Sequence, residues 1–234
     1  MSHNPKKANA FIAAIAVIGI CSVANGFNQS ANWHLQEALP LFAIAVAASR
    51  MKVTLPGLTG TMSVNLPFVL IAVAGLNLAE ALLVGCASTA AQCWPSRGAM
   101  LKPAQLLFNV SSMASAVAVG WQVFHHGANG QPAWLAAGLL LPLAGLGFFL
   151  IQTVSVSIVI ALTDGGLVRK IWSTIVQMTF PYFVLSAGVA SMAMAARQAW
   201  PVFLLVLLVM YGTYRSFRVY FRREVAAKAA TAAK

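Results

Sequence analysis

The sequence is poor in acidic residues and in charge of any kind. It has four Asp and Glu among 234 residues, only 8% of its residues are charged, and 60% are hydrophobic. A soluble domain of this length needs far more polar surface, so we expect an integral membrane protein. The scattered carboxylates leave no pair for general acid and base catalysis, and no hydrolase, zinc-protease or nucleotide-loop motif is present. The sequence therefore does not predict an enzyme.

Cysteine is also scarce. Cys21, Cys86 and Cys93 all fall within apolar runs and have no second Cys or His at metal-ligand spacing. We expect them to be buried thiols that pack as small apolar residues. The adjacent His125 and His126 have no further ligands nearby in sequence, and neighbouring helical side chains point in different directions. The sequence predicts no metal site and no cofactor.

Basic residues, by contrast, are abundant: fifteen Lys and Arg give a formal net charge of +11. They stand in short clusters between apolar runs and not along one amphipathic face, which argues against a nucleic-acid partner. One threading of the apolar runs puts all of them except Arg197 on the same side of a membrane. Because cytoplasmic loops carry the excess of Lys and Arg, we expect both chain ends in the cytoplasm. The expected location is the bacterial inner membrane, crossed several times.

The apolar runs predict an all-α, polytopic membrane helix bundle of about eight helical segments. Residues 63–94 match either one long helix or two short ones. A single helix would place Arg97 and Lys102 outside, whereas a hairpin that turns at Asn77 keeps both inside, so we expect the hairpin. The expected segments are 8–24, 35–49, 63–76, 78–94, 103–124, 134–162, 171–196 and 200–217.

The two ends of the chain carry further signals. Lys6 and Lys7 precede the first apolar run, and residues 22–24 match a small-residue cleavage motif, so a signal peptide is the alternative to a retained first helix. We expect one membrane domain over residues 1–223 and a short cytoplasmic Ala/Lys tail over 224–234. A basic and aromatic collar near the end of the last helix is expected to bind anionic lipid head groups. Its basic residues are Arg215, Arg218, Arg222 and Arg223.

Several polar residues at membrane depth are candidate ligand-binding groups. Asn109, Ser112 and Ser115 recur at a spacing of three, so they share one helix face, where they either pack against a neighbouring helix or line a polar cavity. Glu37 and Glu80 start predicted helices near the outer surface, where each favours the positive end of the helix dipole or belongs to an outward-facing pocket. The full candidate set is Asn109, Ser112, Ser115, Glu80, Glu37, Gln152, Ser63 and Asn65.

The segment 50–67 is the least regular part of the chain. Two glycines and two prolines forbid a continuous helix there, and Val53, Thr54 and Leu55 favour extended backbone. Irregular backbone near a membrane must be buried in protein or line a watery cavity. The segment is therefore either a cytoplasmic connector with a re-entrant tip or part of a binding site.

Three short stretches carry a resemblance to a known family. They are the basic-Val-x-Leu-Pro stretch that begins at Lys52, the Leu-Phe-Asn that ends at Asn109, and the Ala-Leu-Thr-Asp-Gly over residues 161–165. With them, residues 35–223 resemble the amino-terminal membrane domain of bacterial HD-GYP and GGDEF signalling proteins. No signature of either enzyme domain follows residue 223, so we expect a stand-alone sensor. That family's arrangement is also similar to the substrate-capture subunits of energy-coupling factor transporters.

Two functions follow from these expectations. The first is a membrane sensor or scaffold module that binds a small molecule or lipid and couples to a cytoplasmic signalling enzyme. The second is a capture subunit that takes up a small solute and needs a transporter ATPase. A purely structural assembly factor is a third possibility and predicts no ligand at all.

Overall fold

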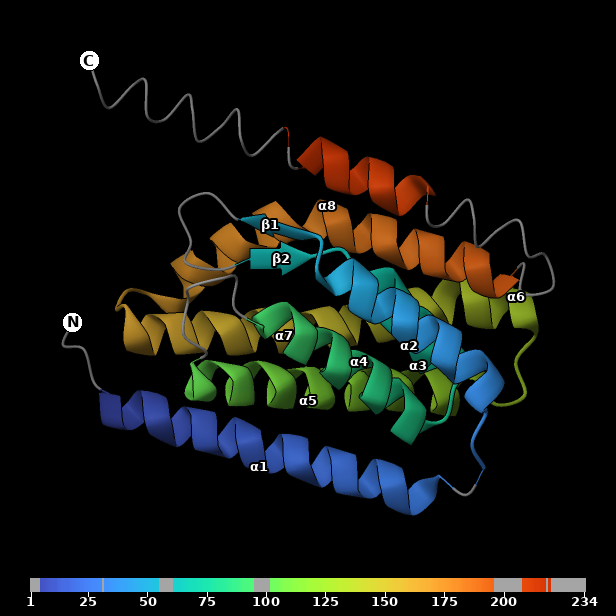
Figure 1. The fold of residues 1–234 in the computed structure, drawn as a ribbon, viewed down its shortest axis with the longest axis horizontal. Helices are drawn as coiled ribbons and strands as arrows, with labels where there is room; N and C mark the ends of the chain where they lie inside the picture. Colours follow the sequence, from blue (N-terminus) through green and yellow to red (C-terminus); the bar gives the residue numbers. More distant parts are fainter. Residues whose placement is uncertain are drawn as a thin grey trace.

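The computed structural model describes residues 5–30, 32–54, 61–94, 102–195, 208–217 and 219. In these ranges the chain is a bundle of helices that run back and forth along its long axis, so the predicted all-α membrane bundle is confirmed (Figure 1). Residues 208–217 add a helical segment beside α8. The helices are α1 (Pro5–Gln29), α2 (Leu35–Ser49), α3 (Leu66–Gly75), α4 (Leu78–Cys93), α5 (Pro103–Ala128), α6 (Ala133–Leu135), α7 (Leu141–Thr163) and α8 (Val168–Ala195).

Among the described residues, four helical stretches are long and apolar enough to cross a membrane: Lys6–Gln29, Pro103–Ala128, Ala133–Thr163 and Val168–Ala195. The helices α2, α3 and α4 are apolar but shorter. The predicted hairpin is present, because α3 and α4 meet at Asn77.

The short helix α3 forms the centre of the bundle. It is apolar on all sides, which is typical of a helix that is covered by protein all round. Phe68, Val69 and Leu70 are almost completely buried, and the helices α2, α4, α5 and α8 pack around them. Large apolar side chains such as Val17 and Val184 are instead exposed on the outside of the bundle, as expected of a surface that faces lipid.

The stretch from α6 to α7 contains one turn of π-helix, Ala136–Leu140. Pro142 stands two residues after this turn and has no backbone N–H to donate to the carbonyl of Gly138, four residues earlier. A π-turn is a usual way to accommodate such a missing bond within a longer helix. The expected segment 134–162 is therefore one helical stretch with a local distortion near its start.

A two-stranded antiparallel ribbon connects α2 to α3. It consists of β1 (Lys52–Thr54) and β2 (Thr61–Ser63), with Val53 paired to Met62. Extended backbone is thus confirmed at two of the three residues predicted, and Leu55 lies outside the described residues. Arg50 and Lys52 donate to the carbonyls of Ala91 (2.9 Å) and Trp94 (3.2 Å). These bonds satisfy carbonyls at the carboxyl end of α4 and put cations at its negative pole.

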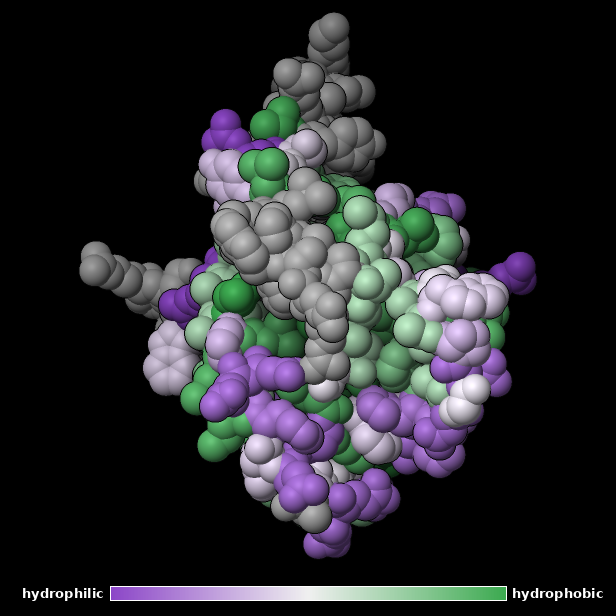
Figure 2. All heavy atoms as spheres, turned by 90° about the vertical axis from the view of Figure 1, so that its right-hand side faces the viewer, coloured by the Kyte–Doolittle hydropathy of each residue, from purple (hydrophilic) through white to green (hydrophobic). Residues whose placement is uncertain are grey.

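The described Lys and Arg outside residues 208–217 lie where α1, α5 and α8 begin, on the left in Figure 1, and where α2 ends, nearer the middle of that view. We call this the basic end; its members are Lys6, Lys7, Arg50, Lys52, Lys102, Arg169 and Lys170. The opposite end holds the α1–α2 connection and the α5–α6 connection, whose described residues include no Lys or Arg. Figure 2 faces that end, where hydrophilic residues lie next to the apolar flanks of the bundle.

Some sequence-based expectations need correction or lie outside the described residues. All three cysteines are in helices, but Cys21 is exposed on α1, and Cys86 and Cys93 are only half-buried. Cys21 was therefore wrongly expected to be buried, because an apolar run does not tell which helix face meets lipid. Arg215 is exposed in the segment 208–217. Arg197, Arg218, Arg222, Arg223 and the tail 224–234 lie outside the described residues.

Candidate functional site

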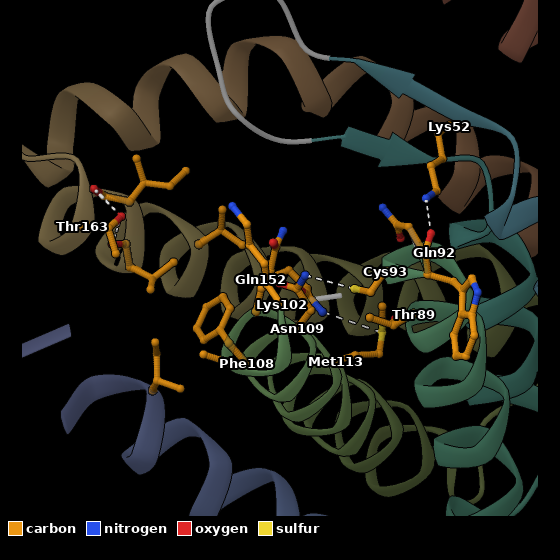
Figure 3. A pocket seen from close by; sticks show the side chains of 17 residues that line it. Lys52, Thr89, Gln92, Cys93, Lys102, Phe108, Asn109, Met113, Gln152 and Thr163 are labelled. Atoms are coloured by element: carbon orange, nitrogen blue, oxygen red, sulfur yellow. Dashed lines mark hydrogen bonds between the residues drawn. The ribbon is translucent and has the colours of Figure 1, made fainter. Parts of the chain in front are cut away.

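A cavity of about 700 Å³ lies at the basic end. That volume is within the usual range for small-molecule pockets. We call it the large chamber; residues of α1, α4, α5 and α7 line it together with Lys52 of the ribbon. Side chains from these separate elements converge on it in Figure 3. Its polar lining consists of Lys52, Thr89, Gln92, Lys102, Gln105, Asn109, Gln152 and Thr163.

Two side-chain amides in the large chamber donate to sulfur. The Nδ2 of Asn109 lies 3.2 Å from the Sγ of Cys93, and the Nε2 of Gln152 lies 3.7 Å from the Sδ of Met113. Sulfur is a weak acceptor in both a thiol and a thioether. The two amides can therefore exchange these partners at low cost for an oxygen acceptor of a ligand.

A third polar group in this chamber has no hydrogen-bond partner in the part of the chain that the structure describes. Thr89 is only 5% exposed, it lines the large chamber from α4, and its Oγ1 makes no hydrogen bond within the described structure. Buried hydroxyls in native proteins are nearly always paired, and leaving one unpaired costs about 1–3 kcal/mol. Thr89 and Asn109 line the same chamber from two helices, α4 and α5, that pack against each other.

A smaller chamber of about 210 Å³ adjoins the first and reaches deeper between α3, α5, α7 and α8. We call it the small chamber. Phe148, Phe149 and Phe183 form much of its wall, and the rings of Phe149 and Phe183 stack with centroids 4.8 Å apart. The two chambers share part of their lining, namely Gln92, Met113, Gln152 and Val156.

The polar residues at the mouth of the small chamber form a connected network. Ser63 donates to the Oδ1 of Asn65 at 2.7 Å and lies 2.9 Å from the Oε1 of Gln92. Asn65 in turn donates to the hydroxyl of Ser88 at 2.9 Å. These bonds hold the end of the ribbon and the start of α3 against α4, which fixes the position of Gln92 between the chambers.

The sequence was compared with protein families, with curated proteins and with solved structures. The sequence model of the MASE9 family matches residues 12–218, which is most of the chain. The chain belongs to the MASE9 family. MASE domains are membrane-associated sensory domains, so the predicted sensor-type membrane domain is confirmed at that level. No curated protein and no solved structure matches the chain.

Four of the eight candidate residues line the two chambers of this MASE9 domain. Asn109 lines the large chamber, Gln152 lines both, and Ser63 and Asn65 line the small one. They come from three separate parts of the sequence, and the packing of α3, α5 and α7 brings them together.

The remaining two serines of the stripe serve helix packing in this domain. Ser112 is buried between α5 and α7, and its hydroxyl lies 3.4 Å from the Oε1 of Gln152. Ser115 is buried and donates to the carbonyl of Ser111 at 2.9 Å, within its own helix. Neither serine lines a chamber that is described here, although Ser112 holds a residue that does.

Glu80 and Glu37 lie at the opposite end of the domain. Glu80 is 1% exposed and caps α4: its Oε2 accepts the backbone N–H of Asn77 at 3.2 Å, and the side chain of Asn77 accepts the N–H of Glu80 at 2.9 Å. A second oxygen of Glu80 accepts the N–H of His34. Glu37 is exposed in the first turn of α2. These positions match the helix-dipole alternative for both carboxylates.

Sequence reasoning missed several lining residues. Thr89 and Gln92 stand in an apolar helix at a spacing of three, which is a stripe of the same kind as Asn109 and Ser112 but shorter. The sequence indicates for Lys52 and Lys102 only a place on the cytoplasmic side, because nothing in it shows that the two loops meet. Tyr182 lines the small chamber from the middle of α8, where a lone tyrosine carries no positional signal.

Proposed function

We propose that this MASE9 domain is a sensor that binds a small molecule or lipid in the large chamber and signals to a cytoplasmic partner. The observation that carries the proposal is the set of underused donors in that chamber. Two amides there donate to sulfur, and the buried hydroxyl of Thr89 has no partner among the described residues. A ligand with oxygen acceptors satisfies all three donors. Among the described residues, the two amides have sulfur as acceptor and the hydroxyl of Thr89 has no acceptor.

The orientation of the site follows from the charge pattern. Both the large chamber and the ribbon lie at the basic end, and Lys and Arg mark the cytoplasmic side of a membrane protein. We therefore place the ligand site near the inner face of a bacterial inner membrane that the chain crosses several times. A capture subunit would need its chamber on the outer side, so the described residues favour the sensor over the transporter.

A contact path leads from the chambers to the helical segment 208–217. Tyr182 lines the small chamber, and its ring also meets the ring of Phe217 edge-on, with centroids 6.3 Å apart. Met210 in the same segment is 3% exposed and belongs to the hydrophobic core. A ligand that shifts Tyr182 therefore acts on this segment, which is the last helical part of the described chain. We propose that the segment passes the signal to a cytoplasmic enzyme.

Thiol protection at Cys93 tests the location of the ligand. Cys93 lines the large chamber, and replacing Cys21 and Cys86 by Ala leaves it as the only thiol. We expect maleimide to modify Cys93 at least tenfold more slowly in native membranes than in protein that was stripped in detergent and returned to phosphatidylcholine vesicles. A cysteine-free chain with Leu167→Cys, on the exposed α7–α8 connection, controls for general accessibility. Equal rates at Cys93 in both preparations would contradict the proposal.

A further inference from the structure

We infer that the two chambers form one site for an amphiphile with a single apolar chain and an anionic head group, a carboxylate or a phosphate. This inference rests on the proposed function and names the ligand class of the same site. Charge, hydrogen-bond donors and shape each support this ligand class.

The charged groups of the large chamber have one sign. Lys52 and Lys102 both line it, and none of its described lining residues is Asp or Glu. The Nζ of Lys52 donates to the carbonyl of Trp94 at 3.2 Å, which uses one of its three N–H bonds. Two ammonium groups in one chamber repel each other, and a bound anion relieves that repulsion. The head group is therefore anionic.

The uncharged polar groups of the large chamber are suited to the same head group. Thr89 on α4, Asn109 on α5 and Gln152 on α7 each bring a donor to it, and in Figure 3 these side chains point toward one region. Oxygens of a carboxylate or phosphate are much stronger acceptors than the sulfurs that Asn109 and Gln152 now use. Of the three, Asn109 lies about two helical turns from Lys102 and can donate to a head group at the lysines, whereas Gln152 lines both chambers and lies at their junction.

The small chamber presents mostly hydrocarbon, because its polar groups are bonded within the protein. Thr179 donates to the carbonyl of Ile175 at 2.7 Å, and Thr153 accepts from the indole N–H of Trp172 at 3.1 Å. The hydroxyl of Tyr182 accepts the backbone N–H of Leu66 at 3.2 Å. What remains for a ligand is the wall of phenylalanine rings and aliphatic side chains, which favours an apolar chain.

The two chambers together are long enough for a lipid chain. Lining residues on α7 run from Phe148 in the small chamber to Thr163 in the large one, about 22 Å of helix at ~1.5 Å per residue. Val156 lines both chambers and lies between them. An extended chain of a dozen or more carbons fits this span, with its head group at the lysines and its end against the phenylalanines.

Binding of radiolabelled hexadecyl phosphate to the chain in phosphatidylcholine nanodiscs tests the inference, with empty nanodiscs as background. We expect one molecule per chain to bind above that background. Butyl phosphate, which has the head group without the long chain, should compete at least fiftyfold more weakly. Hexadecyltrimethylammonium, which has the chain with the opposite charge, should not compete.

One pair of substitutions tests the head-group contacts. Changing both Lys52→Gln and Lys102→Gln should weaken binding of hexadecyl phosphate at least tenfold. The control is Lys170→Gln, because Lys170 is an exposed residue of the basic end that lines neither chamber. The control should bind within twofold of the unchanged chain.

Two further substitutions test the chain contacts independently. Val156→Phe fills the junction and Thr179→Phe fills the small chamber, and both positions are only half-buried, so the helices can keep their packing. Each should weaken hexadecyl phosphate at least tenfold and leave the weak binding of butyl phosphate unchanged. Val154→Phe is the control, since Val154 is exposed on the same helix.

Three results would overturn the inference. The first is that Val156→Phe and Thr179→Phe bind hexadecyl phosphate with wild-type affinity while the double lysine variant loses binding. The ligand would then place no chain in the small chamber, and the proposed function would stand. The second is competition by hexadecyltrimethylammonium, which would contradict the requirement for an anionic head group. If hexadecyl phosphate does not bind, the inferred ligand class is wrong. The proposed function fails as well only if Cys93 is equally reactive in native membranes and in stripped protein.

Discussion

The ring of Tyr182 meets the ring of Phe217 edge-on, with centroids 6.3 Å apart and planes 89° apart. On its other side Tyr182 lines the small chamber and accepts the N–H of Leu66. One side chain therefore contacts the candidate site, the start of α3 and the segment 208–217. This arrangement is the contact through which the proposed function couples a ligand to a partner.

The coupling can be tested at Tyr182 itself. Tyr182→Phe keeps the ring against Phe217 and loses only the hydroxyl, whereas Tyr182→Ala loses both. An edge-on aromatic pair is worth about 0.5–1.5 kcal/mol, so we expect ligand removal to speed amide hydrogen exchange in residues 208–217 about fivefold in the wild type. The Phe variant should keep this response and the Ala variant should lose it. An unchanged response in the Ala variant would show that the coupling runs elsewhere.

The capping box of α4 predicts a stability effect that is separate from ligand binding. Glu80→Ala removes the acceptor for the N–H groups of Asn77 and His34, and we expect a loss of about 2–3 kcal/mol in the free energy of unfolding. Glu37→Ala, in an exposed first turn, should cost less than about 1 kcal/mol. Thermal unfolding in a neutral detergent measures both. Equal effects of the two changes would count against the capping role.

Close helix packing predicts a cost for adding a single methyl group. A Cβ on Gly19 of α1 would lie 2.7 Å from the Cα of Ser111 on α5, so Gly19→Ala forces the two helices apart. We expect a loss of about 1–3 kcal/mol, measured by thermal unfolding. Gly188→Ala is the matched control, since nothing lies within 4 Å of its added Cβ. A normal melting temperature for Gly19→Ala would mean that α1 does not pack on α5 as described.

Orientation in the membrane is testable by labelling single cysteines. In a chain with all three native cysteines changed to Ala, we expect an impermeant maleimide to label Asn129→Cys in intact spheroplasts. Leu167→Cys, near the basic end, should react only after the membrane is permeabilised, because Lys and Arg keep that end inside. The reverse pattern would invert the orientation and place both chambers near the outer face.

The fold was largely predictable from the sequence because apolar length and positive charge are both read directly from the chain. The hairpin at Asn77 illustrates this, since the choice between one helix and two depended only on which side Arg97 and Lys102 occupy. The π-turn before Pro142 was not predicted, because a proline in an apolar run is compatible with several local solutions. The exposure of Cys21 was also missed, since both the core and the lipid favour apolar residues.

The candidate site was predictable only in part. Asn109 was found because it lies in a polar stripe within an apolar helix. Thr89 and Lys102 were not found, because their role depends on how α4, α5 and the ribbon meet, and these contacts join distant parts of the sequence. Glu80 was a candidate ligand-binding residue because it is a carboxylate at membrane depth. Its position at a helix start already indicated the cap that the structure shows.

Native mass spectrometry of the chain, released gently from its own membrane, tests the central claim most directly. We expect one bound small molecule per chain in the wild type and in Ser115→Ala, whose serine does not line the chambers. Asn109→Leu and Thr89→Val keep the side-chain shape but remove the donors, and each should lower the occupancy at least tenfold. Bare polypeptide in the wild type, or equal occupancy in all four chains, would contradict a ligand in the large chamber.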